Sequence, residues 1–331
     1  MNQREQQGDI MAQFARMLGT TVLNNEVHVP EGKGSGCITG FKPNEFIGMV
    51  LMKYRLSTPI ELMDENKEPE EDRRRGSGPH LTFLFQNCLN GVDDSKRKTV
   101  QISTMGVGTE KELMAVDQRA DLLITIYSKF LARQFPTYKQ STLLRQIIEG
   151  KKSLFFENTV NLQQQNIIRE LTTRDPGDIL RSFYQTLKIS ELVCELLITL
   201  LDRDCQQAYP VNHDDLKQIY NVRDYMLAHL NEPPVVSTLA AKAAMSVSKL
   251  ERLFKQIFGD SLFHYYQLRR MERAAELLKS GHCTVASVGY QLGFSNLSHF
   301  SRLFEKVMGK KPKKYTEDKF QSIVHIEQNP T

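Results

Sequence analysis

The sequence TVASVGYQLGFSNLSHFSRLFEKVMGKKPKKY, residues 284–315, decides the fold of the carboxy-terminal third of the chain. Val285, Val288 and Leu292 recur at i, i+3 and i+7, which predicts the apolar face of a short helix. Gly293 follows, and glycine readily adopts the positive φ at which such a helix ends. A second helix is predicted from the apolar residues at helical spacing after it: Leu297, Phe300, Leu303, Phe304 and Val307.

The same design occurs once more, fifty positions earlier. LERLFKQIFG at 250–259 aligns with FSRLFEKVMG at 300–309, and Arg252, Leu253, Phe254 and Gly259 recur as Arg302, Leu303, Phe304 and Gly309. Ahead of the first copy, STLAAKAAMS predicts a short helix and a turn near Ala244 and Met245. Ser246 or Ser248 is the expected cap of the next helix, and Ser295 or Asn296 that of the later copy. Two helix-turn-helix units therefore share the last hundred residues.

Three segments, SVSKLERLFKQIFG, RRMERAAELL and GFSNLSHFSRLFEKVMGKKPKKY, resemble the DNA-binding domain of the AraC/XylS family of bacterial transcription regulators over residues 216–315. The resemblance is specific because the turn glycines, the Leu-Phe pairs, the Gly-x-x-Pro ending at 309–312 and the duplication agree with one another. It implies two helix-turn-helix units joined by a long helix. Each recognition helix would enter the major groove, one helical turn or about 34 Å apart.

Carried over residue by residue, the family pattern implies two outward faces that contact DNA. They consist of Ser248, Lys249, Arg252 and Lys255, and of Leu297, Ser298, Ser301 and Arg302. Arg252 and Arg302 are the expected base readers, because arginine bonds bidentately to guanine and contributes about 1–3 kcal/mol of discrimination. Ser298 and Ser301 would reach phosphate or a base edge, and Leu297 a thymine methyl. The alternative for each is a solvated helix face, and the matched arginines favour DNA contact.

The first unit departs from the family at Ala244, where glycine is common, so its positive-φ residue is expected elsewhere or under strain. The helix that joins the units is expected from Ser261 to Ser280. Its cations Arg269, Arg270 and Arg273 would contact phosphates or pair with Glu272 and Glu276. For Arg270 the pairing with glutamate is the favoured interpretation.

Charge is concentrated where the duplication lies. The 331 residues carry a net charge of +4, but residues 236–315 hold fourteen Lys and Arg against five Asp and Glu, a balance of +9. The remainder holds twenty-nine against thirty-four, a balance of −5. Such a basic region predicts a polyanionic partner, with KKPKK at 310–314 as its densest point. That run alone is equally typical of a solubilising tail.

Other signals bound the class of protein. The five cysteines lack metal-site spacing and predict reduced thiols in a cytoplasmic protein. No secretory leader and no apolar run of eighteen residues is found, which argues against secretion or membrane insertion. The glycine-rich GKGSG at 32–36 lacks the order of a phosphate-binding loop, and no catalytic motif occurs, so the chain is not expected to be an enzyme.

Residues 1–160 predict a β-rich domain with strands near 37–41, 46–56, 81–86, 99–105 and 121–127, and a charged loop at 64–79. The strands are expected to close into a small barrel. The family resemblance implies a cupin-like effector domain at this place. Candidate lining residues, equally typical of ordinary core, are Met49, Leu51, Leu81, Phe83 and Phe85. Only His28 and His80 are present, far apart, so no metal centre is expected.

A helical period begins at Asn161. An apolar seam is predicted at Leu180, Phe183, Leu187, Ser190, Cys194, Leu197 and Leu201. It would join two protomers, as in the family, or pack against the chain's own barrel, and the sequence does not choose. Residues 202–215 are the expected linker.

The sequence therefore predicts an α+β protein with a β-rich effector domain (1–160), a helical linker and dimerisation region (161–211) and a DNA-binding domain (212–320). The predicted function is regulation of transcription through double-stranded DNA, as a homodimer that contacts RNA polymerase. Control by a small effector is expected, siderophore-like by a fainter resemblance, and control by a protein partner is the alternative. No cofactor is expected. Activation is expected by analogy, although the sequence leaves repression open.

Overall fold

The computed structural model describes residues 10–57, 80–89, 97–104, 119–150, 152–203, 208–281 and 283–316. The chain divides into two compact units, Met1–His213 and Asp214–Thr331. The charged loop expected at 64–79 lies outside the described residues. Across the described part of the chain, no helix combines the length and apolarity needed to span a bilayer.

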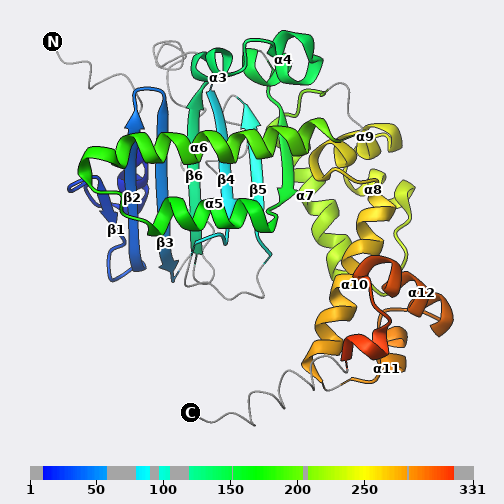
Figure 1. The fold of residues 1–331 in the computed structure, drawn as a ribbon. Helices are drawn as coiled ribbons and strands as arrows, with labels where there is room; N and C mark the ends of the chain where they lie inside the picture. Colours follow the sequence, from blue (N-terminus) through cyan, green and yellow to red (C-terminus); the bar gives the residue numbers. More distant parts are fainter. Residues whose placement is uncertain are drawn as a thin grey trace, which may run out of the picture. The chain divides into compact units, whose positions relative to one another are not determined.

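The first unit is built on one antiparallel sheet of seven strands (Figure 1). The strands are β1 (Glu26–His28), β2 (Gly34–Asn44), β3 (Ile47–Leu56), β4 (His80–Gln86), β5 (Thr99–Thr104), β6 (Arg119–Tyr127) and β7 (Phe155–Thr159). Their order is β1-β2-β3-β6-β4-β5-β7. Five of these are the strands expected from the sequence, with boundaries moved by a few residues. The outermost strands, β1 and β7, were not predicted.

The predicted closure into a barrel is not confirmed. In the described residues β1 pairs only with β2 and β7 only with β5, so the sheet has two edges. The cupin-like assignment is not confirmed either, because the described strands form one sheet and not two packed sheets. The architecture is a mixed one, with a sheet-based amino-terminal unit and a helical carboxy-terminal unit.

The sheet centre is buried on both faces. Met49 and Ile124 lie in one apolar cluster, whereas their chain neighbours Val50 and Leu123 lie in another. Successive side chains of a strand alternate between faces, so the two clusters flank the sheet. Of the five residues considered as pocket lining, four are part of the core, and Leu51 packs against it partly buried.

Helices cover both faces of this sheet. They are α1 (Ile10–Leu18), α3 (Ser128–Gln134), the short 3-10 helix η2 (Tyr138–Gln140), α4 (Thr142–Glu149), α5 (Leu162–Thr173) and α6 (Asp178–Leu201). α5 begins with a capping box between Asn161 and Gln164, where the helical period was predicted to start. α5 and α6 run side by side across one face, and α1 packs on the opposite face (Figure 1).

α6 carries two apolar faces, and the predicted seam coincides with the outer one only in part. The inner face is buried against the sheet and consists of Ile189, Leu192, Val193, Leu196, Leu197 and Leu200. Leu197 was assigned to the seam, but it is 4% exposed. Ile198, 48% exposed, takes its place on the outer face with Leu180, Phe183, Leu187, Cys194 and Leu201. We call these six residues the outer stripe.

The second unit is entirely helical in its described residues. Its helices are α7 (His213–Ala228), α8 (Val236–Lys242), α9 (Val247–Phe258), α10 (Leu262–Ser280), α11 (Val285–Gln291) and α12 (Leu297–Met308). α8 with α9, and α11 with α12, are the two helix-turn-helix units predicted from the duplication. α10 is the predicted connecting helix, and Ser261 caps it as expected.

The turns of both helix-turn-helix units contain a residue with positive φ, but the residue differs between them. Ala244 has φ +52° and Gly293 has φ +76°, and each follows a seven-residue helix. The first helix-turn-helix unit therefore places a non-glycine residue in the left-handed region, which costs about 1–2 kcal/mol. Gly293 has a second reason to lack a side chain: a Cβ there would lie 1.9 Å from the carbonyl oxygen of Asn231.

Exchanging the turn residues should affect stability very unequally. Gly293→Ala should lower the free energy of unfolding by more than about 2 kcal/mol, because left-handed strain adds to a backbone clash. Ala244→Gly, the matched control, should change it by less than about 1 kcal/mol, because relief of strain offsets the added chain entropy. Urea titration of the full chain, followed by circular dichroism, measures both. Equal tolerance of the two substitutions would contradict this account.

Candidate nucleic-acid interface

α9 and α12 are structural repeats of each other. Both contain twelve residues and start fifty positions apart. Ser246 caps α9 by accepting from the Lys249 amide, and Asn296 caps α12 by accepting from the Ser298 and His299 amides. Gly259 and Gly309 end the two helices in the left-handed conformation. The duplication in sequence is thus a duplication of local geometry.

On α9 the four predicted contacts differ in their surroundings. Ser248 and Arg252 are exposed, whereas Lys249 and Lys255 are half-buried. The Lys249 ammonium lies 2.7 Å from the Asp215 carboxylate of α7. This ion pair ties the start of α9 to α7, so Lys249 has a structural partner that the sequence did not reveal.

On α12 the four predicted contacts divide in the same way. Ser298 and Arg302 are exposed, and Ser301 is half-buried. Leu297 is half-buried as well, and its Cδ2 would lie 2.6 Å from a Cβ placed on Gly289 of α11. Leu297 therefore packs against α11, where Gly289 leaves room for its side chain.

Two matched pairs occupy equivalent exposed positions: Ser248 with Ser298, and Arg252 with Arg302. Lys306, one turn beyond Arg302 on α12, is also exposed. The sequence pattern gave no reason to select Lys306, because its counterpart fifty positions earlier is Gln256, which is buried.

The basic tail is anchored to the domain rather than free. Residues 312–316 form a helical turn, and Pro312 is buried. The Tyr315 ring lies edge-on to Phe304 at 5.4 Å, and the Lys279 ammonium lies 5.5 Å from the Tyr315 ring centre. Lys311, Lys313 and Lys314 remain exposed between these anchors, so their charges are held beside α12.

A buried junction joins the two helix-turn-helix units. Arg270 of α10 donates from Nε (2.7 Å) and from Nη2 to the carbonyl oxygen of Leu292, at the end of α11. Its guanidinium lies 3.6 Å from the Phe294 ring centre. One turn earlier, the Tyr266 hydroxyl donates to the carbonyl oxygen of Leu230, 3.0 Å away, in the segment after α7. α10 therefore fixes the turn of the second helix-turn-helix unit relative to the segment that leads into the first helix-turn-helix unit.

The favoured assignment of Arg270 to a surface ion pair was wrong. Arg270 is 7% exposed, and burial lowers the pKa of its guanidinium. Burial likewise raises the pKa of the Tyr266 hydroxyl. Arg269 and Arg273 do pair with glutamates at i+3, Glu272 and Glu276. An i, i+3 pattern on a helix cannot show that Arg270 points inward to a carbonyl twenty-two residues away.

Arg270→Lys should lower the stability of the second helix-turn-helix unit without changing the net charge. A lysine cannot donate in a bidentate geometry, so a charge-assisted bond to a buried carbonyl is lost, at a cost of about 1–3 kcal/mol. Arg273→Lys on the same helix is the matched control, and its exposed pair should change stability by less than about 0.5 kcal/mol. Chemical denaturation of both full-length variants tests this. An Arg270→Lys variant as stable as the control would refute the role of the junction.

Comparison with known proteins places these helices in a family. A family model described as a helix-turn-helix domain matches residues 239–318. A probable transcription factor, PqrA of Proteus vulgaris, is 32% identical over 88 residues, which are 27% of this chain and 72% of that protein. The chain belongs to the AraC family of transcription regulators. The AraC-type region coincides with α8 to α12, so the family is carried by the duplicated unit.

Further relatives extend the AraC match only in part. The transcriptional activator RhaR of Mannheimia succiniciproducens is 24% identical over 165 residues, covering 50% of this chain and 58% of RhaR. The DNA-binding domain of AdpA, solved with a target DNA, is 28% identical, covers 30% of this chain and 91% of that domain, and has a TM-score of 0.29. The chain thus spans about half the length of the first curated relatives that it matches.

Proposed function

We propose that this AraC-family protein binds an asymmetric double-stranded DNA site through α9 and α12, in two successive major grooves. The observation that carries the proposal is the repeated geometry of the two helices, each with a polar N-cap, a left-handed glycine end and an exposed arginine at the same position. A single helix with these features occurs in many folds. Two copies braced by α10 form a rigid pair of readers.

Within this proposal six of the eight sequence-derived residues have distinct roles. Arg252 and Arg302 are the base readers, and Ser248 and Ser298 contact phosphate or base edges. Lys249 and Leu297 act mainly by packing, because one pairs with Asp215 and the other fills the space above Gly289. Exposed Lys306 and the anchored lysines of the tail add phosphate contacts.

Arg302→Ala should relax specificity rather than weaken binding uniformly. The operator is first selected from random duplexes with the full-length protein, and affinities for single-base variants are then measured by fluorescence anisotropy. The variant should lose about 1–3 kcal/mol of discrimination at one or two base pairs. Arg252→Ala should do the same at a position about one helical turn away.

The controls for this experiment distinguish base from phosphate contact. Arg145→Ala alters an exposed arginine in the first unit and should leave affinity unchanged. The logarithm of the parent's association constant should fall linearly with the logarithm of the salt concentration. Uniform weakening of all operator variants by Arg302→Ala would assign Arg302 to phosphate. Absence of salt-dependent binding to any duplex would overturn the proposed function.

We further propose that the outer stripe of α6 joins two copies of the chain. Phe183 is 69% exposed and Leu187 is 54% exposed, and an apolar row of this kind on a soluble surface marks an interface. The stripe repeats at spacings of three, four and seven, as the seam of a dimerising helix does. A homodimer places two double readers on one operator.

The variant Phe183→Glu/Leu187→Glu should be monomeric in sedimentation velocity at concentrations where the parent is dimeric. Neither side chain contributes to the core, so the thermal midpoint of the first unit should change little. Leu162→Glu changes an equally exposed leucine, 72% exposed, outside the stripe and should leave the dimer intact. A dimeric double variant would exclude the stripe as the interface.

Control by a small effector is favoured by two adjoining hollows beside α6. One of about 300 Å³ is lined by Asn44, Glu45, Phe46, Phe130, Arg133 and Gln134. The other, about 130 Å³, shares Phe130 and Gln134 and reaches Val193 and Cys194 of α6. The larger volume lies at the low end for ligand sites and the smaller one lies below it, which favours a small amphiphile over a bulky siderophore-like molecule.

The protein-partner alternative is supported by the same exposed stripe, which a partner could cover in place of a second copy. A thermal-shift screen of the full chain against small amphiphiles, siderophores included, separates the two. A ligand at a hundred times its dissociation constant stabilises by about 2.7 kcal/mol. A contact with RNA polymerase follows from the family resemblance, and co-sedimentation of the DNA-bound protein with the polymerase would test it.

A further inference from the structure

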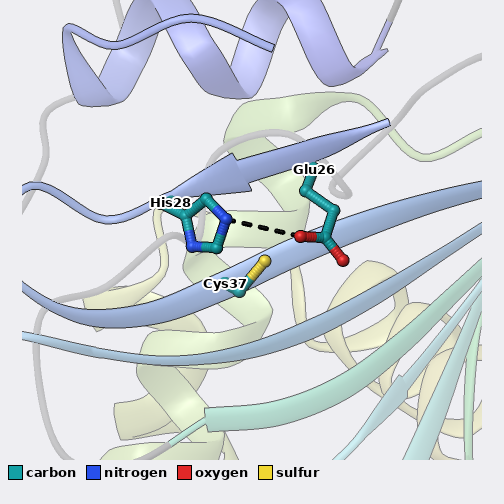
Figure 2. Close-up of side chains that lie close together, drawn as sticks. All are labelled: Glu26, His28 and Cys37. Carbon is teal, nitrogen blue, oxygen red and sulfur yellow. Dashed lines mark ion pairs between the residues drawn. The ribbon is translucent and has the colours of Figure 1, made fainter. Parts of the chain in front are cut away.

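The hairpin formed by β1 and β2 brings together three side chains that bind metals. In the register of the two strands, His28 lies opposite Cys37 and Glu26 lies opposite Thr39. Directly opposed residues share a face of the sheet, so Glu26, His28 and Cys37 point the same way, as Figure 2 shows. Val27 and Ile38 point to the other face and are buried beneath α1.

The three ligand atoms are close enough to share one ion. His28 Nε2 lies 3.3 Å from a Glu26 carboxylate oxygen, and the three ligand atoms all lie within 4.8 Å of one another. Tetrahedral bonds to zinc at its usual lengths separate nitrogen, oxygen and sulfur ligands by about 3.4–3.6 Å. The Glu26–His28 distance already meets this. Since no two of the ligand atoms lie more than 4.8 Å apart, a movement of roughly 1 Å by the cysteine side chain completes the set.

The backbone that carries these ligands is rigid. Asn24 and Asn25 both have positive φ, +51° and +62°, the signature of a two-residue type I′ turn. Leu23 and Glu26 exchange two backbone hydrogen bonds across this turn, at 2.9 and 2.8 Å. The Val29 amide then donates to the Gly36 carbonyl at 3.0 Å, which holds the far end of β1. Ligands on such a hairpin lose little backbone entropy on binding.

We propose that Glu26, His28 and Cys37 form a binding site for one divalent ion of the zinc class. The set offers one carboxylate, one imidazole and one thiolate, and the two anions neutralise the charge of the ion. Three protein ligands leave a fourth position for water or for a small anionic ligand. The ion would also join the three-residue edge strand β1 to β2 by side chains as well as by its backbone bonds.

A threonine hydroxyl lies beside the cysteine of the site. Thr39 Oγ1 lies 3.7 Å from Cys37 Sγ and can donate to the sulfur once the thiol proton has been lost. Hydrogen bonds of this kind orient metal ligands and tune their affinity. Among the described residues, no other group of three histidine, cysteine or acidic side chains meets the same distance criterion.

Cobalt(II) is the probe, because it occupies zinc sites and its bond to a thiolate produces a near-ultraviolet charge-transfer band. Reduced, metal-free full-length protein should develop this band and saturate at one equivalent, and zinc should abolish it. Cys37→Ser should remove the band. His28→Ala, on the other strand, should weaken cobalt binding by at least about tenfold, since even loss of an outer-shell partner costs that much.

The matched control is Cys194→Ser, which removes an exposed thiol elsewhere in the same unit and should leave the titration unchanged. The proposal is overturned if the parent shows no band, if Cys37→Ser retains it, or if Cys194→Ser loses it. Cobalt binding is measured without DNA, so a negative result leaves the proposed DNA-binding function untouched.

Discussion

The hydrogen bond between the Arg270 guanidinium and the Leu292 carbonyl is the constraint on which the geometry of the second helix-turn-helix unit depends. In the proposed function, α12 can present Arg302 to a base only if the turn before the helix is fixed. Leu292 is the C-cap of α11, where unpaired carbonyls carry partial negative charge. A buried cation on α10 satisfies that charge, and Phe294 covers the guanidinium from one side. α10, which connects the two helix-turn-helix units, therefore also sets the angle of α12.

Gly293 completes this junction by steric means. With no side chain, it allows its turn to approach the Asn231 carbonyl, in the segment that leads to α8. Tyr266 binds the Leu230 carbonyl of the same segment. Two backbone segments, at residues 230–231 and 292–293, thus meet beside α10, whose Tyr266 and Arg270 side chains each bond a carbonyl oxygen of one of them. At the equivalent place in the first helix-turn-helix unit, Ala244 carries a side chain at the cost of left-handed strain.

The parts that could be predicted from the sequence are those governed by local chemistry. The caps at Ser246 and Asn296, the helix ends at Gly259 and Gly309 and the spacing of apolar residues all act within a few positions of one another. Prediction from the sequence failed where contacts with distant segments determine the structure. β7 was missed because its sequence, FFENT, does not alternate, yet four of its five residues are buried. The partners of Arg270 and Lys249 and the cluster at His28 depend on tertiary packing or strand register, which side-chain spacing alone does not give.

The two faces of α6 show how a local signal can be correct in kind and wrong in detail. Apolar residues at spacings of three and four predict a seam, but twenty-four residues of this composition support two seams, and a shift of one residue moves Leu197 inward and Ile198 outward. The inner face packs on the sheet and is rigid. Cys194 lines a hollow and also belongs to the outer stripe, so one helix borders both the proposed effector site and the proposed dimer interface. A ligand that shifts α6 by a fraction of a turn would change the side chains presented to a partner. Effector binding and dimerisation would then be coupled across the width of one helix.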